Sequence, residues 1–97
     1  MAAYLIAMVE ITDPDQYSKY IAVSPGVLEQ YGGKFLVRGG EITNLEGDAG
    51  EKRVVVVEFE SIDALKIFYD SPEYVAARGL RAGAADALMI AVPGYQP

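Results

Sequence analysis

Arg38 ends the apolar run Phe35-Leu36-Val37, and a glycine pair flanks this segment on each side. A charged side chain in an apolar strand needs solvent, a carboxylate or a bound anion. With a bound anion, Arg38 is a substrate-binding residue that holds a carboxylate, an enolate or a phosphate. The alternative is a structural ion pair with Glu58 or Asp86, since a hairpin can bring neighbouring strands' side chains together.

A second group of candidate residues lies between positions 69 and 81. Tyr74, Arg78 and Arg81 are spaced by four and three residues, which places them on one face of a helix. The functional interpretation is an anion pocket in which Tyr74 and Arg81 join Arg38 in binding a substrate. The alternative is a solvated helix face, with both arginines near the helix C-terminus, where the dipole favours them.

Proton transfer has two candidate residues, Glu58 and Tyr69. Glu58 is the one carboxylate inside the strongly apolar segment 53–59, and burial there would raise its pKa into a range useful for acid–base catalysis. Tyr69 directly precedes the group that holds Tyr74 and Arg81. The acidic residues around position 13 are explained by capping of a helix, so no metal site is expected.

Composition excludes several classes of chemistry and partner. The 97 residues make one domain, 1–97, and carry a net charge of −6, which disfavours nucleic acid and anionic membranes. The chain has no histidine and no cysteine, so imidazole bases, thiol nucleophiles and His- or Cys-ligated metals are excluded. We expect no cofactor. The absence of a long apolar run and of a basic N-terminal region predicts a cytoplasmic protein.

Hydrophobic periodicity and capping signals predict the order β-α-β-β-α-β. Asp13-Pro14 starts the first helix, with Gln16 reaching back to the cap, Pro25 interrupting the helix and Gly32-Gly33 ending it. The second helix starts at Glu60 or Ser61, and Ser71-Pro72 caps a further helical piece. The predicted strands are 3–11, 34–38 with a kinked continuation through 41–46, 53–59 and 87–92. This is a ferredoxin-like α+β fold, a four-stranded antiparallel sheet with its helices on one face.

The first, third and fourth strands are apolar at both alternating positions. Helices on one face can cover only half of these side chains, and an open apolar face of that size is more than monomers usually expose. A second copy of the chain packed sheet against sheet buries it. We therefore expect a homodimer with a closed or nearly closed barrel of strands.

Four motifs stand out along the chain, namely Tyr31-Gly-Gly-Lys-Phe-Leu-Val-Arg-Gly-Gly40, Val56-Val-Glu-Phe59, Ser71-Pro-Glu-Tyr74, and Arg81 followed by Gly83-Ala-Ala85. They resemble those of a family of small bacterial proteins catalogued as a domain of unknown function, within the dimeric α+β barrel superfamily. The resemblance covers nearly the whole chain. It implies a ferredoxin-like subunit paired sheet to sheet. The superfamily also includes cofactor-free monooxygenases, haem-dependent chlorite dismutases and dye peroxidases, and muconolactone-type isomerases, but this sequence has neither the tryptophan nor the histidine that the first two groups use.

Two functions fit these residues. In the first, a cofactor-free barrel binds or transforms a small anionic or carbonyl-bearing molecule, which Arg38, Tyr74 and Arg81 hold while Glu58 or Tyr69 moves a proton. In the second, the protein is a non-catalytic structural or interaction dimer whose arginines and glutamates form ion pairs. The sequence does not decide whether the protein is an enzyme.

Overall fold

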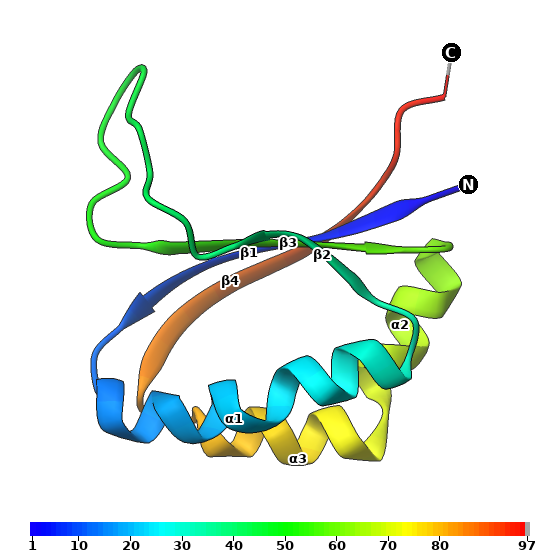
Figure 1. Ribbon diagram of the computed structural model, residues 1–97, viewed down its shortest axis with the longest axis horizontal. Coiled ribbons are helices and arrows are strands. Elements are labelled where there is room, and N and C mark those ends of the chain that lie inside the picture. The colour runs from blue at the N-terminus through cyan, green and yellow to red at the C-terminus, as the bar shows by residue number, and fades with distance from the viewer. Residues whose placement is uncertain (97) are drawn as a thin grey trace.

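The computed structural model describes residues 1–96. Its sheet has four strands in the order β2-β3-β1-β4, all paired antiparallel, and the helices lie on one side of it (Figure 1). The fold is the ferredoxin-like βαββαβ arrangement that the sequence predicts, with the second helical segment divided at Ser71-Pro72. The elements are β1 (Ala3–Ile11), α1 (Pro14–Gln30), β2 (Lys34–Arg38), β3 (Arg53–Phe59), α2 (Ile62–Asp70), α3 (Pro72–Leu80) and β4 (Ala85–Pro93).

The helices begin and end where the capping signals predict. The side chains of Asp13, Ser61 and Ser71 each accept a backbone N–H hydrogen bond from the residue three positions later, at 3.0 to 3.2 Å. These bonds satisfy donors that have no partner inside the helix. At the other end of α1, Gly32 has φ of 84°, a conformation that glycine adopts without strain, and the chain turns there into β2.

Three local predictions were wrong. Pro25 lies inside a continuous α1, because burial of Tyr17, Val27 and Leu28 on the same helix outweighs the lost hydrogen bond. The side-chain amide of Gln16 donates to the Leu80 carbonyl at 2.7 Å instead of returning to the cap.

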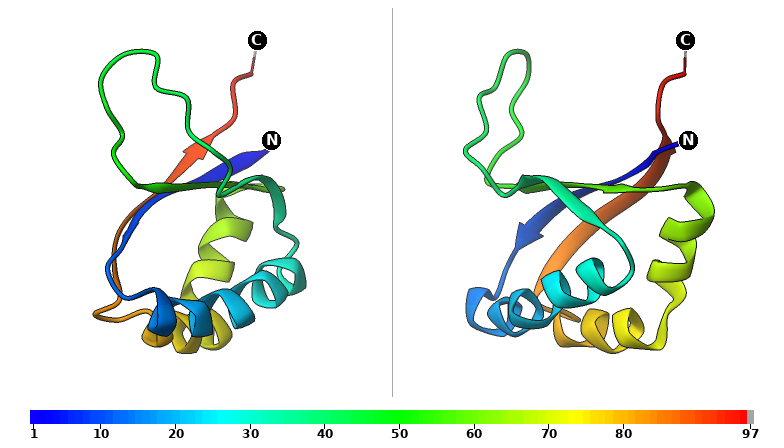
Figure 2. Two further views of the ribbon diagram at one scale, coloured as in Figure 1. Left: turned by 60° about the vertical axis from the view of Figure 1, so that its left-hand side comes forward. Right: turned by 45° about the vertical axis from the view of Figure 1, so that its right-hand side comes forward.

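The strand expected over 41–46 is the third of these errors. Gly39 has φ of 71°, which leaves the extended region, and its N–H makes a last bond to the Val54 carbonyl at 2.9 Å. β2 therefore ends at Arg38, and residues 39–52 form a long loop that projects away from the helices (Figure 2).

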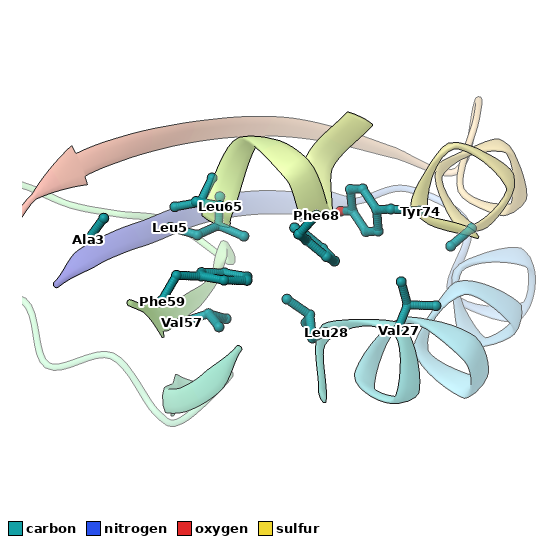
Figure 3. Close-up of a cluster of buried hydrophobic side chains, with 10 residues drawn as sticks. Ala3, Leu5, Val27, Leu28, Val57, Phe59, Leu65, Phe68 and Tyr74 are labelled. Carbon is teal, nitrogen blue, oxygen red and sulfur yellow. The ribbon is translucent and has the colours of Figure 1, made fainter. Parts of the chain in front are cut away.

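The two faces of the sheet differ in whether helices cover them. On the face toward the helices, here called the inner face, Ala3, Leu5, Ala7 and Val9 of β1 are buried. The main core joins Ala3 and Leu5 to side chains from β3 and all three helices (Figure 3). Phe68 of α2 is at its centre, with ring centroids 5.3 Å from Phe59 and 4.3 Å from Tyr74.

The opposite face, here called the outer face, carries the other half of the apolar side chains. Leu88, Ile90 and Val92 of β4 are exposed there, beside the half-buried Tyr4, Ile6 and Met8 of β1. The prediction of strands that are apolar on both faces is therefore correct. Within residues 1–96, no helix is both long enough and apolar enough to cross a bilayer.

Candidate functional site

A cavity of about 40 Å³ lies between the inner face of the sheet and α1. The backbone of α1 runs close to α3 and farther from the strands. Side chains fill most of this separation, but Ala7 and Ala87 are too small to close it. Since one ordered water needs roughly 10–15 Å³ of such space, the cavity holds a few waters or the head group of a small molecule.

Three arginines line this cavity, and its described lining contains no aspartate or glutamate. Arg38 and Arg53 come from β2 and β3, at one edge of the sheet. Arg81 comes from the end of α3, beside β4 at the other edge. Three strand spacings of about 4.8 Å separate the backbones of β2 and β4, so cationic groups stand at both ends of an apolar space.

A β-bulge in β2 turns Arg38 toward this cavity. Lys34 faces Glu58 on the outer side, and Phe35 faces Val57 on the inner side. The register then shifts by one residue at Leu36, so that Arg38 faces Val55 on the inner side. Strict alternation would place Arg38 on the outer face with Lys34.

The expected ion pair between Arg38 and Glu58 is therefore not formed, because the bulge separates them. Asp86, the other expected partner, lies on β4 opposite Glu10 of β1. The Arg38 guanidinium instead stacks 4.6 Å from the Phe35 ring centroid, and the residue is exposed to solvent. Arg38 therefore lies at the solvent-exposed mouth of the cavity.

Gly39 leaves room for the second arginine. A Cβ atom built on Gly39 would collide with the Arg53 guanidinium, at 2.8 Å from Cζ. The positive φ of Gly39 and this close approach together explain why a glycine stands at the end of β2. Arg53 is half-buried, and it reaches the cavity beside Arg38.

Two phenols and a guanidinium meet at the inner end of the cavity. The hydroxyl oxygens of Tyr20 and Tyr74 are 2.6 Å apart. Arg81 Nη2 donates to Met89 Sδ at 3.3 Å, and Arg81 Cζ lies 5.2 Å from the Tyr20 ring centroid. Tyr74 is fully buried, whereas Tyr20 and Arg81 are half-buried.

Burial and the neighbouring Tyr20 raise the pKa of Tyr74, which keeps its hydroxyl protonated at neutral pH. Burial lowers the pKa of Arg81, but Tyr74 and Tyr20 outweigh this effect and the net pKa is raised. Burial also raises the pKa of Tyr17, and the charges of Arg53 and Arg81 both act to lower it.

Three of the five predicted site residues line one cavity. Arg38, Tyr74 and Arg81, which the sequence predicts to bind a substrate, all line it. The proposed proton-transfer residues Glu58 and Tyr69 do not. Glu58 points to the outer face, where it accepts a hydrogen bond from the Tyr4 hydroxyl at 3.3 Å and raises the pKa of that phenol.

Tyr69 packs with Arg78 between α2 and α3. The Arg78 guanidinium lies 4.0 Å from the Tyr69 ring centroid, and its Nη2 donates to the Tyr69 carbonyl at 3.4 Å. The solvated face expected for Arg78 is therefore replaced by a cation–π contact. Tyr69 holds this arginine and does not reach the cavity lining.

Arg53 and Tyr20 are the lining residues that the sequence reasoning missed. Arg53 has the same strand parity as the buried Val57 and Phe59, so alternation alone could have placed it on the inner face. Tyr20 lies one turn after the buried Tyr17 on α1, where a core role and a cavity role have the same spacing. The pairing of Tyr20 with Tyr74 carries no sequence signal, because 54 residues separate them.

Residues 2–95 match the family described as "Domain of unknown function (DUF1330)". The chain belongs to this family. The family match confirms the resemblance read from the sequence motifs. Among curated proteins, none matches the sequence significantly.

Solved structures share the fold of this DUF1330 protein. A protein of unknown function from Rhodopseudomonas palustris is 24% identical, with a TM-score of 0.77 over 99% of this chain and 84% of that one. A dimeric ferredoxin-like protein of unknown function from Thermobifida fusca is 20% identical, with a TM-score of 0.62 over 97% and 92%. SnoaB from Streptomyces nogalater, a cofactor-independent oxygenase, is 12% identical, with a TM-score of 0.70 over 99% and 95%. These likenesses show the ferredoxin-like fold of dimeric α+β barrels.

Proposed function

We propose that this DUF1330 protein binds a small organic anion in the cavity between its sheet and α1. The observation that supports this most strongly is the lining itself, with three arginines and no acidic residue among the described residues. A half-buried guanidinium without a carboxylate neighbour is costly, and a bound anion removes that cost. The net charge of −6 gives anions no long-range attraction, so binding depends on these local contacts.

The size and polarity of the cavity restrict the anion to a small molecule with a planar oxygen-bearing group. The enclosed space of about 40 Å³ takes a head group, and the exposed Arg38 at the mouth leaves room for the remainder. Guanidiniums bind carboxylates and enolates through paired N–H groups. Binding needs no cofactor, because every charge that it uses comes from the chain.

Any proton transfer in this site would draw on the phenols of Tyr20 and Tyr74. Glu58 and Tyr69, the acid–base candidates from the sequence, are not among the residues that line this cavity. SnoaB shares the fold at 12% identity, which supports the architecture and no particular reaction. We therefore propose ligand binding as the function and assign no reaction to the site.

Titration with short carboxylates tests this proposal. Pyruvate and propionate should raise the thermal midpoint of the wild-type protein, because a ligand that binds the native state stabilises it. Arg81→Met should weaken pyruvate binding about ten- to a hundredfold, the effect of removing a charge-assisted hydrogen bond. Lys66→Met is the matched control, since this exposed α2 residue loses the same charge away from the cavity. Equal affinities in wild type and Arg81→Met would contradict the proposal.

We also propose that two copies of the chain pair through their outer faces. The exposed Leu88, Ile90 and Val92 form an apolar strip there. The loop 39–52 and the tail after β4, which hold Leu45 at 91% and Tyr95 at 92% exposure, project on this same side of the sheet (Figures 1 and 2). The related proteins from Thermobifida fusca and Jannaschia sp. are described as dimeric, the latter with a TM-score of 0.72 at 14% identity over 97% of this chain and all of that one.

Sedimentation equilibrium at micromolar concentration tests the dimer. Wild type should sediment at twice the chain mass of 10.5 kDa. Ile90→Asp should give the monomer, because its carboxylate would be buried unpaired in the interface. Ile67→Asp, on the exposed side of α2, is the control and should stay dimeric. A monomeric wild type would exclude the dimer while leaving the anion site untouched.

A further inference from the structure

The inner end of the cavity holds more hydrogen-bond donors than acceptors. Tyr20 and Tyr74 have two hydroxyl hydrogens between them, and their contact of 2.6 Å uses one. Arg81 brings five N–H donors to the same place. The acceptors there are the two phenol oxygens and Met89 Sδ, which lies 3.3 Å from Arg81 Nη2 and 3.8 Å from the Tyr74 hydroxyl. A thioether is a weak acceptor, so the cluster retains donors for which it has no strong partner.

Ionisation of Tyr74 does not relieve this excess at neutral pH. Burial and the adjacent Tyr20 raise the pKa of Tyr74, so it keeps its hydrogen. Arg81 stays charged at any pH at which the protein is folded. No carboxylate within residues 1–96 lines the cavity to accept these hydrogens.

We propose that Tyr20, Tyr74 and Arg81 form a donor site for the carbonyl or enolate oxygen of a small oxo-acid. The carboxylate of the same molecule would lie toward Arg38 and Arg53. This inference rests on the proposed function and names the ligand class for it. An oxygen with lone pairs and no hydrogen is the group that a donor-rich, acceptor-poor site selects.

The hydroxyls of Tyr20 and Tyr74 can donate a hydrogen bond to such a ligand while both tyrosine rings stay in place. Either hydroxyl can be the donor in the contact between Tyr20 and Tyr74. When an oxygen enters the cavity, Tyr74 donates to Tyr20, and the Tyr20 hydrogen turns to the ligand. Tyr20 is then the residue that touches the ligand, and the fully buried Tyr74 is a positioning residue.

The two groups of arginines line one cavity, with Arg38 and Arg53 from one edge of the sheet and Arg81 from the other. The space between the ends is lined by apolar side chains, among them Ala7, Val55 and Val57. A ligand with oxygens at both ends and carbon between them matches this distribution.

Comparing pyruvate with propionate tests the inference, because the two acids have the same charge and chain length and differ at one carbonyl oxygen. In an NMR titration, wild type should bind pyruvate about tenfold more tightly than propionate, as expected for one buried hydrogen bond to a charged cluster. Lactate has a hydroxyl at that carbon, which can accept a hydrogen bond but brings a hydrogen that needs an acceptor, so its affinity should lie between those of pyruvate and propionate. Tyr20→Phe should remove the preference for pyruvate over propionate.

Two further variants separate the ligand contact of Tyr20 from the effect of removing any other tyrosine hydroxyl. Tyr74→Phe should reduce the preference less than Tyr20→Phe, because it removes the orienting bond and not the ligand contact. Tyr31→Phe, which removes a hydroxyl from the same helix outside the cavity, should retain the full preference. A wild type that binds pyruvate and propionate equally, or a Tyr20→Phe protein that keeps the preference, would overturn this inference and leave carboxylate binding intact. Binding of neither acid would overturn the proposed function itself.

Discussion

The two faces of the sheet are made by alternate residues of the same strands, yet the helices cover only one of them. On the inner face, Leu5 and Val57 are buried under the helices, and a small cationic cavity remains beside them. On the outer face, Leu88 and Ile90 are 59% and 45% exposed. Similar apolar composition therefore produces a completed core on one side and an uncovered surface on the other.

The difference shows which functions the chain can supply alone. The helices cover the inner face and bring Arg81 and the two phenols to the β4 edge, so the candidate binding site is complete within one subunit. The outer face has no element of this chain over it in residues 1–96, and burying it takes another molecule. Ligand binding and self-association are thus separate properties of opposite faces, and substitutions should separate them.

The largest expected effect is on the inner side. Phe68→Ala should lower the free energy of unfolding by about 3–5 kcal/mol, because a fully buried aromatic ring leaves a cavity behind. Ile67→Ala, its exposed neighbour on α2, should change stability by no more than about 0.5 kcal/mol. Urea denaturation of both variants checks this, and similar losses would mean that the inner core is not closely packed.

A smaller effect is expected on the outer face. Leu88→Lys should reduce the association free energy by about 2 kcal/mol, the contribution of burying one leucine side chain. The thermal midpoint of wild type should rise with protein concentration, and this dependence should weaken in the variant. A midpoint that does not depend on concentration in wild type would show that the outer face stays uncovered.

Gly39→Ala should affect the mouth of the cavity. An L-residue at φ of 71° costs about 1–2 kcal/mol, and its Cβ would also displace the Arg53 guanidinium. We expect a corresponding loss of stability in urea together with weaker carboxylate binding. Gly40→Ala, where a Cβ meets nothing within 4 Å and φ is not positive, is the control and should preserve both.

The smallest expected effect is a change at alkaline pH. The folded-state pKa values of Tyr74 and Tyr17 are raised, mainly by burial, so the stability that their neutral forms contribute is complete below the unfolded value near 10. It is lost as the pH rises through the folded-state values. Tyr74→Phe should therefore flatten the alkaline decline in thermal midpoint. An unchanged decline would show that Tyr74 ionises as easily in the folded state as in the unfolded state.

The sequence predicts the fold well because its signals are local and agree with one another. β1 and β3 have the predicted bounds, and Asp13 and Ser71 cap helices as their residue types indicate. Pro25 was misjudged because tertiary burial of α1 outweighs a local helix penalty. The strand expected after Gly40 fails because Gly39 takes a conformation that ends an edge strand.

The candidate site is less predictable, since it depends on long-range contacts. Arg38 was found as an isolated charge, but its direction depends on a bulge at Leu36 that no residue type indicates. Arg81 and Tyr74 were found through helical spacing. Tyr20 joins them through a contact across 54 residues, which periodicity does not contain.

The four arginines of the chain offer the most direct test of the binding site. In a spectrum that resolves the Nε–H resonances of 15N-labelled arginine, saturating pyruvate should move the signals of Arg38, Arg53 and Arg81. Arg78 stacks on Tyr69 outside the cavity, so its signal should stay in place as an internal control. Movement of the three cavity resonances alone is the result predicted here. Equal movement of all four, or movement of none, would contradict an anion site between the sheet and α1.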